Sequence, residues 1–420
     1  MIITDRSAKN IPKYDIMIEW AKTFDPIYLR PEIVVLARVL PLVTFILAVL
    51  SFWKGLAPVS VPFAGLLLQT AVLYAVTRRN KALDEVYAYK DSIGVYGTML
   101  ERFEKDIFQT EYLQYLQKNI YSPDGKTAWT QIKELSGIAE RIADRSNAMF
   151  LIVNIFTLWD IHCLIALENW KKKSGRYLER WVDAVAELEA LGSLAGIYFE
   201  HPDWVMPELS AEEPVVQAVQ TGHPLLQNPV CNDVVLDRQA GVLLITGSNM
   251  SGKSTLLRTM GVNLVLAYVG APVHARSFRC SLLHIYSCMR VRDDLVEGLS
   301  SFYAELLRIK MIVEASKTEK NVFFLLDEIF KGTNSEDRHA GAKVVIKQLA
   351  QAGAMGLVST HDLELGALER ESGQRIKNYH FREFYENEEI RFDYQLKPGI
   401  STTRNAMYLI RLAGIEAEKE

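Results

Sequence analysis

Residues 245–259 read ITGSNMSGKSTLLRT, and this stretch decides the fold of the C-terminal half of the chain. It fits the pattern GxxxxGK[ST], in which glycines let backbone N–H groups curl around phosphate groups. The pattern alone also arises by chance. Here the apolar run at 241–246 precedes it and a helix is expected to begin near Ser254, so the helix N-terminus adds partial positive charge. The predicted phosphate-binding residues are Gly247, Ser248, Asn249, Met250, Ser251, Gly252, Lys253, Ser254 and Thr255.

A second stretch, NVFFLLDEIFKGTNSEDR at 321–338, predicts a buried strand that ends in two acids. In open α/β sheets, ligands bind at the carboxyl ends of the strands. Asp327 is therefore expected to support Mg²⁺ together with Ser254, and Glu328 to position or deprotonate an attacking water. Lys253 is expected to reach the β- and γ-phosphates. An acidic pair alone would be weak evidence for a nucleotide site, but an acidic pair together with an upstream phosphate loop is strong evidence.

A third apolar run, AMGLVST at 354–360, is followed by His361. A histidine at a strand end can sense a γ-phosphate through a hydrogen bond, although a lone histidine carries little weight. The order of phosphate loop, acidic strand and histidine strand is that of ABC-type ATPases. We therefore expect an α/β P-loop NTPase domain with a mostly parallel sheet flanked by helices.

Composition sets limits on the whole chain. The 420 residues are 49% hydrophobic, which is ample for two or three domains. The formal net charge is −4, so no global basic field indicates nucleic acid, and a local basic patch stays open. The four cysteines form no CxxC pair, which favours a reducing compartment and argues against a zinc site.

Two apolar runs, 33–53 and 56–77, are separated by Lys54 and Gly55. Each approaches the roughly 20 residues needed to cross a hydrocarbon core, so we predict a transmembrane helical hairpin. The basic residues at 78–81 place both chain ends in the cytoplasm, at the cytoplasmic membrane. The alternative is a buried helical hairpin in a cytoplasmic protein, which Arg38 and the prolines at 41, 58 and 62 favour.

Residues 82–200 show apolar residues at three- and four-residue spacing, which predicts an all-α region. The apolar run at 149–159 is too short for a third span, and we expect a core helix there. Prolines and acids at 201–215 indicate a domain boundary. The predicted domains are an N-terminal segment at 1–32, the hairpin at 33–77, a helical core and lever domain at 78–210, and an ATPase domain at 211–420.

From about residue 221 to the end, the chain resembles the ATPase domain of the MutS family. The matching blocks, in family order, are GHPLL, ITGSNMSGKST, DDLVEGLSSFYAEL at 293–306, LLDEIFKGTNSEDR, STHDLEL and FDYQLKPGISTTRNAMYLIRLAGI. The family's loop usually has proline where this chain has Ser248, and its acidic block usually continues with Gly-Arg where this chain has Phe330-Lys331. The resemblance is weaker over 82–200, which looks like the family's core and lever helices.

The resemblance implies ATP and Mg²⁺ as cofactors and a composite site in a homodimer. Ser300 matches the segment that reaches the γ-phosphate of the partner's nucleotide, so it is expected to act in trans. The alternative for Ser300 is a plain helix cap. No mismatch-reading module fits before residue 33, and the chain most resembles a membrane-hairpin subgroup of MutS-like ATPases, truncated at its N-terminus.

The expected function is ATP hydrolysis that closes and reopens a dimer and moves its helical arms. The arms are expected to hold duplex DNA through phosphate contacts, without mismatch reading. A membrane-tethered scaffolding or mechanical ATPase with no nucleic-acid role is the alternative. A transporter is a weaker idea, because four spans in a dimer are few and no acid lies within the apolar runs.

Overall fold

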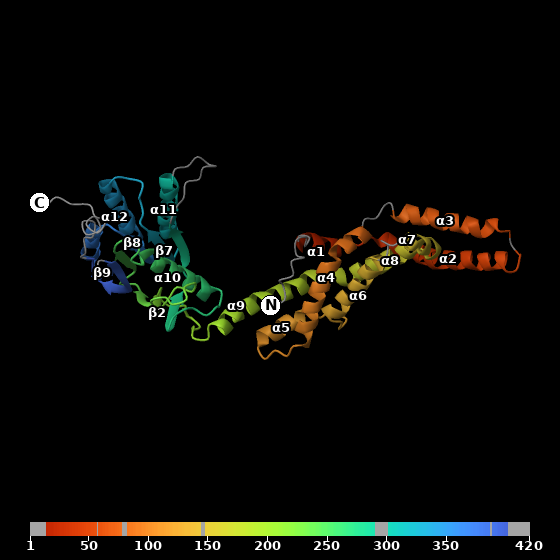
Figure 1. The fold of residues 1–420 in the computed structure, drawn as a ribbon, viewed down its shortest axis with the longest axis horizontal. Coiled ribbons are helices and arrows are strands. Elements are labelled where there is room, and N and C mark those ends of the chain that lie inside the picture. Colours follow the sequence, from red (N-terminus) through yellow and green to blue (C-terminus); the bar gives the residue numbers. More distant parts are fainter. Residues whose placement is uncertain are drawn as a thin grey trace. The chain divides into compact units, whose positions relative to one another are not determined.

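The computed structural model describes residues 14–56, 58–77, 82–143, 148–289, 301–386 and 389–401. The chain divides into two compact units, one up to Gly192 and one from Ser193 onward. The first is helical, and the second is built on two sheets (Figure 1). The division falls inside helix α9 (Leu178–Glu200).

The helices of the first unit follow one another with short connections. Besides α9, they are α1 (Tyr14–Lys22), η2 (Pro26–Leu29), α2 (Pro31–Phe52), α3 (Ser60–Thr77), α4 (Ala82–Lys105), α5 (Glu111–Asn119), α6 (Ala128–Ala143), α7 (Ala148–Thr157), α8 (Trp159–Ser174) and η4 (Gly175–Tyr177).

The core of this unit lies between α4, α6, α8 and α9. Helix α4 shows why: its buried residues, including Val86, Tyr89, Ile93 and Leu100, recur at three-, four- and seven-residue spacing and form one apolar face. Trp170 of α8 is buried among them, and its indole N–H donates to the Gln131 carbonyl of α6 at 2.7 Å. The predicted all-α region is therefore confirmed.

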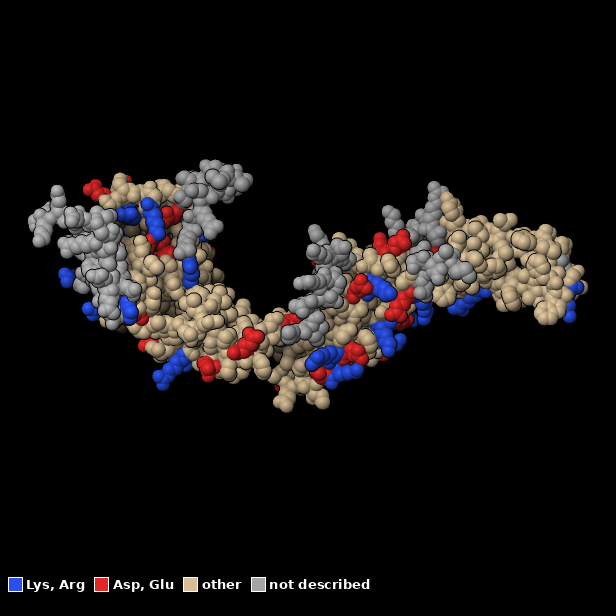
Figure 2. All heavy atoms as spheres, viewed as in Figure 1, with Lys and Arg blue, Asp and Glu red and all other residues tan. Residues whose placement is uncertain are grey.

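Helices α2 and α3 lie side by side as a hairpin (Figure 1). Their large apolar side chains are exposed: Phe45 is 66% exposed and Leu67 72%. Among the described residues, α2 is by itself long and apolar enough to cross a membrane, and α3 is a shorter apolar helix. Figure 2 shows the visible face of this hairpin with almost no charged side chains.

Helix α7 corrects the expectation of a core helix at 149–159. Leu151, Ile152 and Phe156 are each more than half exposed. Helix α7 contacts α3, and it meets α8 at a bend of 73° next to Leu158, whose φ is 55°. The run is helical as expected, but its apolar side chains extend the exposed surface of the hairpin instead of filling a core.

The second unit contains a small sheet and a large one. The four-stranded sheet has the order β1 (Glu208–Ser210), β5 (Ser277–Ser281), β2 (Val216–Thr221) and β3 (Asn232–Leu236). The six-stranded sheet has the order β10 (Glu389–Pro398), β9 (Ile376–Glu386), β4 (Val242–Thr246), β8 (Met355–Thr360), β7 (Val322–Asp327) and β6 (His284–Cys288). Its pairs are parallel except β10 with β9, so the predicted mostly parallel sheet is confirmed.

Both faces of the large sheet are covered, which explains why its central strands are continuous apolar runs. Leu243 and Ile245 of β4 pack on the side of α10 (Lys253–Tyr268), while Val242 and Leu244 pack on the opposite side. That opposite side carries α11 (Ser301–Thr318) and α12 (Ser335–Gln351). The chain between β8 and β9 forms η5 (Leu363–Ala367) and α13 (Leu368–Glu371). The carboxyl ends of β4, β7 and β8 meet at one edge of the sheet.

Gly175→Ala is expected to destabilise the helical unit. A Cβ at Gly175 would lie 1.9 Å from the carbonyl oxygen of Ala21, so the two backbones must separate. Overpacking of this kind costs roughly 1–3 kcal/mol. Thermal melting of the full chain, followed by circular dichroism, measures the effect.

Gly137→Ala in α6 is the matched control. A Cβ there meets nothing within 4 Å, and alanine in a helix interior should gain roughly 0.5–1 kcal/mol. A Gly175→Ala protein that melts at or above the wild-type temperature would contradict the close approach of α1 and η4.

Candidate nucleotide site

The loop between β4 and α10 turns sharply at the edge of the large sheet. Gly247, Met250 and Gly252 have φ values of 151°, 66° and 107°, in the region that favours glycine. A Cβ at Gly247 would lie 2.8 Å from the Ser251 hydroxyl and 3.1 Å from the Phe381 carbonyl oxygen. Helix α10 begins at Lys253, directly after Gly252, so the predicted strand, loop and helix are all present.

Lys253 points back into this loop. Its side chain is 3% exposed, and its ammonium group donates to the carbonyl oxygens of Gly247 at 2.9 Å and Ser248 at 2.8 Å. Glu328 lies 3.5 Å away. Burial lowers the pKa of the Lys253 ammonium group, and the Glu328 carboxylate opposes that shift.

Asp327 at the end of β7 accepts hydrogen bonds from two hydroxyl groups. Its Oδ1 accepts from the Ser254 hydroxyl at 2.9 Å and from the Ser359 hydroxyl at 2.5 Å. Ser254 comes from the first turn of α10 and Ser359 from β8, which pairs with β7 at this position. The two residues predicted to hold Mg²⁺ are therefore in direct contact.

Glu328 lies at the centre of a cluster of cationic and hydrogen-bonding groups. Its carboxylate is 2.7 Å from His361 Nε2 and 2.5 Å from Lys331 Nζ. The hydrogen bond from His361, against the effect of burial, holds the pKa of the Glu328 carboxyl well below its usual range. His361 Nε2 also lies 2.9 Å from Asn249 Oδ1 and 3.4 Å from Lys253 Nζ.

Two cavities are lined in part by Gly252 of the loop. The first, of about 440 Å³, is lined by Lys253, Ser254, Asp327 and Glu328 together with most of the loop. The second, of about 260 Å³, shares Gly252 and Thr255 with the first. Its apolar lining is Leu226, Pro229, Val230, Leu256, Phe381 and Tyr394.

Residues 243–418 match the family model described as MutS domain V. Over its C-terminal part, the chain is similar to the MutS family. The DNA mismatch repair protein MutS of Geobacillus kaustophilus is 33% identical over 262 residues, which cover 60% of this chain and 29% of that protein.

Two further MutS relatives show similar identity and coverage. The mismatch repair protein of Aquifex pyrophilus is 33% identical over 241 residues, covering 56% of this chain and 28% of its own length. That of Carboxydothermus hydrogenoformans is 33% identical over 269 residues, covering 62% and 31%. The chain thus spans less than a third of the length of these MutS relatives.

The two departures from the usual MutS pattern have local explanations. The Ser248 hydroxyl donates to the buried Glu383 carboxylate of β9, so this residue ties the phosphate loop to the neighbouring strand. Phe330 has a φ of 63°, which costs an L-residue about 1–2 kcal/mol. Its ring is 7% exposed and packs in the core beneath α12, and this burial offsets the strain.

The apolar cavity contains residues that the sequence analysis did not single out. Tyr394 stands at a left-handed φ of 53°, where β10 is shifted in register against β9. Asn232 of β3 holds this irregularity: its Nδ2 donates to the Tyr394 carbonyl, and its Oδ1 accepts from the Leu396 amide at 2.6 Å. The FDYQL block contains Tyr394, but only the folded sheet places it beside Gly252.

Ser300, the residue expected to act in trans in the MutS dimer, lies outside the described residues. Met250, which is 83% exposed, lines the cavity of about 440 Å³. Each of the remaining residues predicted for the site lines this cavity or contacts a residue that does.

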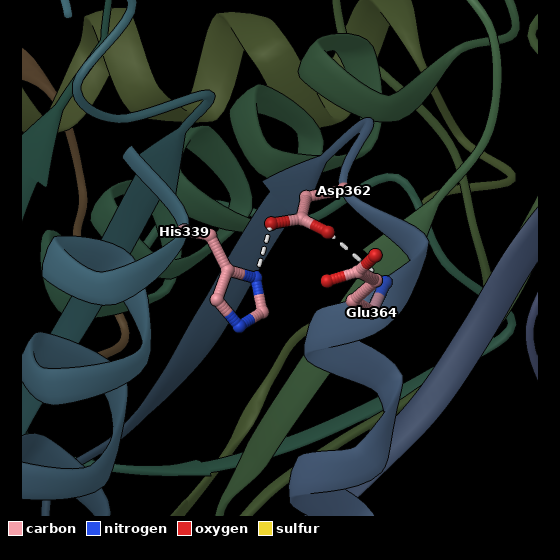
Figure 3. Close-up of side chains that lie close together, drawn as sticks. All are labelled: His339, Asp362 and Glu364. Carbon is pink, nitrogen blue, oxygen red and sulfur yellow. Dashed lines mark hydrogen bonds and ion pairs between the residues drawn. The ribbon is translucent and has the colours of Figure 1, made fainter. Parts of the chain in front are cut away.

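His339, Asp362 and Glu364 group beside the candidate nucleotide site (Figure 3). Their potential ligand atoms all lie within 4.8 Å of one another. Asp362 Oδ2 is 2.7 Å from His339 Nδ1, and Oδ1 accepts from the Glu364 amide at 3.0 Å as the N-cap of η5. These bonds give Asp362 a structural role that accounts for the grouping.

Proposed function

We propose that this chain is a Mg²⁺-dependent ATPase that binds ATP in a composite dimer site of the MutS type. The observation that carries this proposal is the meeting of Lys253, Asp327 and Glu328 around one cavity, at the carboxyl edge of a parallel sheet. The MutS relatives support it, because each is named a DNA mismatch repair protein and aligns over this unit.

The loop residues bind the phosphates in this proposal. Lys253 exchanges the carbonyl oxygens of Gly247 and Ser248 for phosphate oxygens, and the first-turn amides of α10 contribute partial positive charge. The hydroxyl of Ser254 and the carboxylate of Asp327, 2.9 Å apart, are the oxygen ligands that Mg²⁺ prefers, so these residues fit the ion. The bound ion would neutralise charge on the phosphates.

Glu328 orients the attacking water. A carboxylate whose pKa lies well below its usual range stays ionised and accepts charge-assisted hydrogen bonds, but it is a weak proton acceptor. Of the two roles predicted for Glu328, water positioning is therefore the better supported. His361 donates to Glu328 through Nε2, and this N–H group can turn to a γ-phosphate oxygen once ATP is bound.

The cavity of about 260 Å³ receives the nucleoside part of ATP. It opens beside Gly252 and Thr255, which also line the phosphate cavity, and its lining offers aromatic and aliphatic surface. Flat heteroaromatic rings bind to surfaces of this kind. We expect the base to lie near Tyr394 and Phe381.

Homodimer formation completes the site in this proposal, with Ser300 of one copy reaching the γ-phosphate bound by the other. ATP binding closes the dimer and hydrolysis reopens it, so the helices of the first unit move as arms.

We propose duplex DNA as the substrate of these arms, held through backbone phosphates without mismatch reading. The names of the relatives support duplex DNA as the substrate, while the net charge of −4 gives no further support for DNA binding.

We further propose that α2 and α3 form a membrane hairpin, which would place the protein at the cytoplasmic membrane with its ATPase unit in the cytoplasm. The 22 residues of α2 span about 33 Å, close to the thickness of a hydrocarbon core. The polar residues Thr44, Ser51 and Gln69 are buried, while the large apolar side chains face outward. A soluble hairpin would show the reverse arrangement.

Glu328→Gln is expected to keep ATP binding and to lose turnover by about 10²- to 10³-fold, since it removes the charge that orients the water. Lys253→Ala should abolish ATP binding, because it removes the buried ammonium group. Steady-state phosphate release and the affinity for a fluorescent ATP analogue, measured in detergent, separate the two effects. Wild-type turnover in Glu328→Gln, or unchanged affinity in Lys253→Ala, would contradict the assigned roles.

DNA is tested by ATPase assays of the detergent-purified chain with and without long duplex DNA, at low and moderate salt. Contacts to backbone phosphates predict stimulation that fades as salt rises, because bound counterions are released on association. Robust hydrolysis that ignores DNA even at low salt would instead support a membrane-tethered scaffolding ATPase with a protein partner.

The membrane hairpin is tested by alkaline carbonate extraction of membranes from expressing cells. Wild-type protein should stay in the membrane pellet. The double variant Leu42→Glu with Phe45→Glu should be released, because a charge at the centre of a span costs roughly 2.5–3.5 kcal/mol. Leu42 and Phe45 are 58% and 66% exposed.

The matched control changes Ile107 and Tyr115 to glutamate. These residues are 94% and 59% exposed but lie outside the hairpin, so their variant should remain in the pellet. Wild-type protein recovered in the soluble fraction without detergent would refute the hairpin while leaving the ATPase proposal intact.

A further inference from the structure

The turn after β7 carries Glu328 on a strained backbone. Glu328 has a φ of 51° and Phe330 a φ of 63°, so two non-glycine residues within three positions adopt the left-handed conformation. Such a conformation persists only where surrounding contacts hold it. The groups that hold this turn therefore also control where the Glu328 carboxylate lies.

Two hydrogen bonds tie the turn to neighbouring elements, while within the turn the Phe330 carbonyl accepts from the Thr333 amide at 3.3 Å and from the Thr333 hydroxyl at 3.2 Å. The Glu328 amide donates to the Ser359 carbonyl of β8 at 3.0 Å, which continues the sheet. The Phe330 amide donates to Glu305 Oε1 at 2.7 Å. The second bond comes from a side chain of α11, which is separate from the sheet hydrogen bonds.

Glu305 is placed for this contact by its surroundings. It is partly buried and lines the phosphate cavity, together with Phe302 from the preceding turn of α11. Burial raises the pKa of its carboxyl, and the hydrogen bond from Phe330 opposes that shift. Lys331 makes its close ion pair with Glu328, at 2.5 Å, and its charge adds to the hydrogen bond from Phe330 in favouring the ionised Glu305 carboxyl.

We infer that Glu305 is a positioning residue: by accepting from the Phe330 amide it holds the left-handed turn that presents Glu328 to the attacking water. This inference rests on the proposed ATPase function and extends it. Releasing the Phe330 amide would let the peptides between Glu328 and Gly332 rotate, which moves the Glu328 carboxylate relative to the phosphates. A displacement of about 1 Å in such a group can slow a reaction about 100-fold.

The test compares Glu305→Asp with Glu305→Gln. The first variant shortens the side chain and keeps its negative charge, and the second keeps the length and removes the charge. The glutamine side chain has a carbonyl oxygen that can accept the hydrogen bond from the Phe330 amide, so Glu305→Gln preserves this bond without the charge. Asp keeps the charge, but its side chain is one methylene shorter and its oxygen no longer reaches the amide. Glu314→Asp, on the exposed side of α11, is the matched control.

We expect Glu305→Asp to lower kcat about tenfold or more with ATP-analogue affinity within about threefold of wild type, since only the water-positioning step is disturbed. Glu305→Gln and Glu314→Asp should keep kcat within about threefold. A Gln variant slower than the Asp variant would show that charge matters and would overturn the inference. Equal kcat in Asp and wild type would also overturn it, as would a parallel loss of affinity and kcat.

Hydrogen exchange of the nucleotide-free protein supplies a readout that needs no ATPase activity. The peptide that contains Phe330 should exchange faster in Glu305→Asp than in wild type or Glu305→Gln. Unchanged exchange in the Asp variant would refute the hydrogen bond. Absence of ATP hydrolysis in wild type would refute the proposed function alone.

Discussion

The arrangement of the site depends on a break in the extended backbone directly after Asp327. Successive side chains of a strand point to opposite faces, so Asp327 and Glu328 could not both face one cavity if β7 continued. The left-handed conformation of Glu328 ends the alternation, and both acids line the same cavity. The consequence is a division of roles: Asp327 contacts Ser254, while Glu328 contacts His361.

Charge balance explains the resting contacts of the loop. Lys253 is a buried cation, and burial of an unpaired charge is costly. Two loop carbonyl oxygens and the nearby Glu328 carboxylate lower this cost in the absence of nucleotide. In the proposed reaction, phosphate groups would provide the same compensation with formal negative charge. The exchange would then free Glu328 from one of its cations when a water must be oriented.

The sequence predicted the parts of the site that are local in the chain. The strand before Gly247, the helix after Gly252 and the acids at the end of β7 follow from patterns of fewer than twenty residues, and the structure contains all of them. Glu305, Glu383 and Tyr394 were missed because each reaches the site from an element distant in sequence. Glu305 and Tyr394 lie in blocks that resemble the MutS family, but neither block shows which groups these residues contact in the fold.

The error at α7 has a related cause. A run of eleven apolar residues indicates a helix that avoids water, but it does not say whether protein or lipid covers the helix. In the structure, the other apolar helices α2 and α3 are exposed as well, so the described residues leave these three helices uncovered.

The large sheet and the hairpin follow opposite rules of burial. The large sheet buries Leu244 and Phe324 completely and leaves polar groups at its edge, as expected in water. The hairpin buries Gln69 completely, with neither amide atom bonded among the described residues, and exposes Phe63 and Leu67. At Gly65 a Cβ would lie 2.8 Å from the Thr44 hydroxyl, so small residues let α2 and α3 approach closely. Close packing through small and polar residues, with apolar side chains outward, is how helices associate in lipid, where apolar burial gives no driving force.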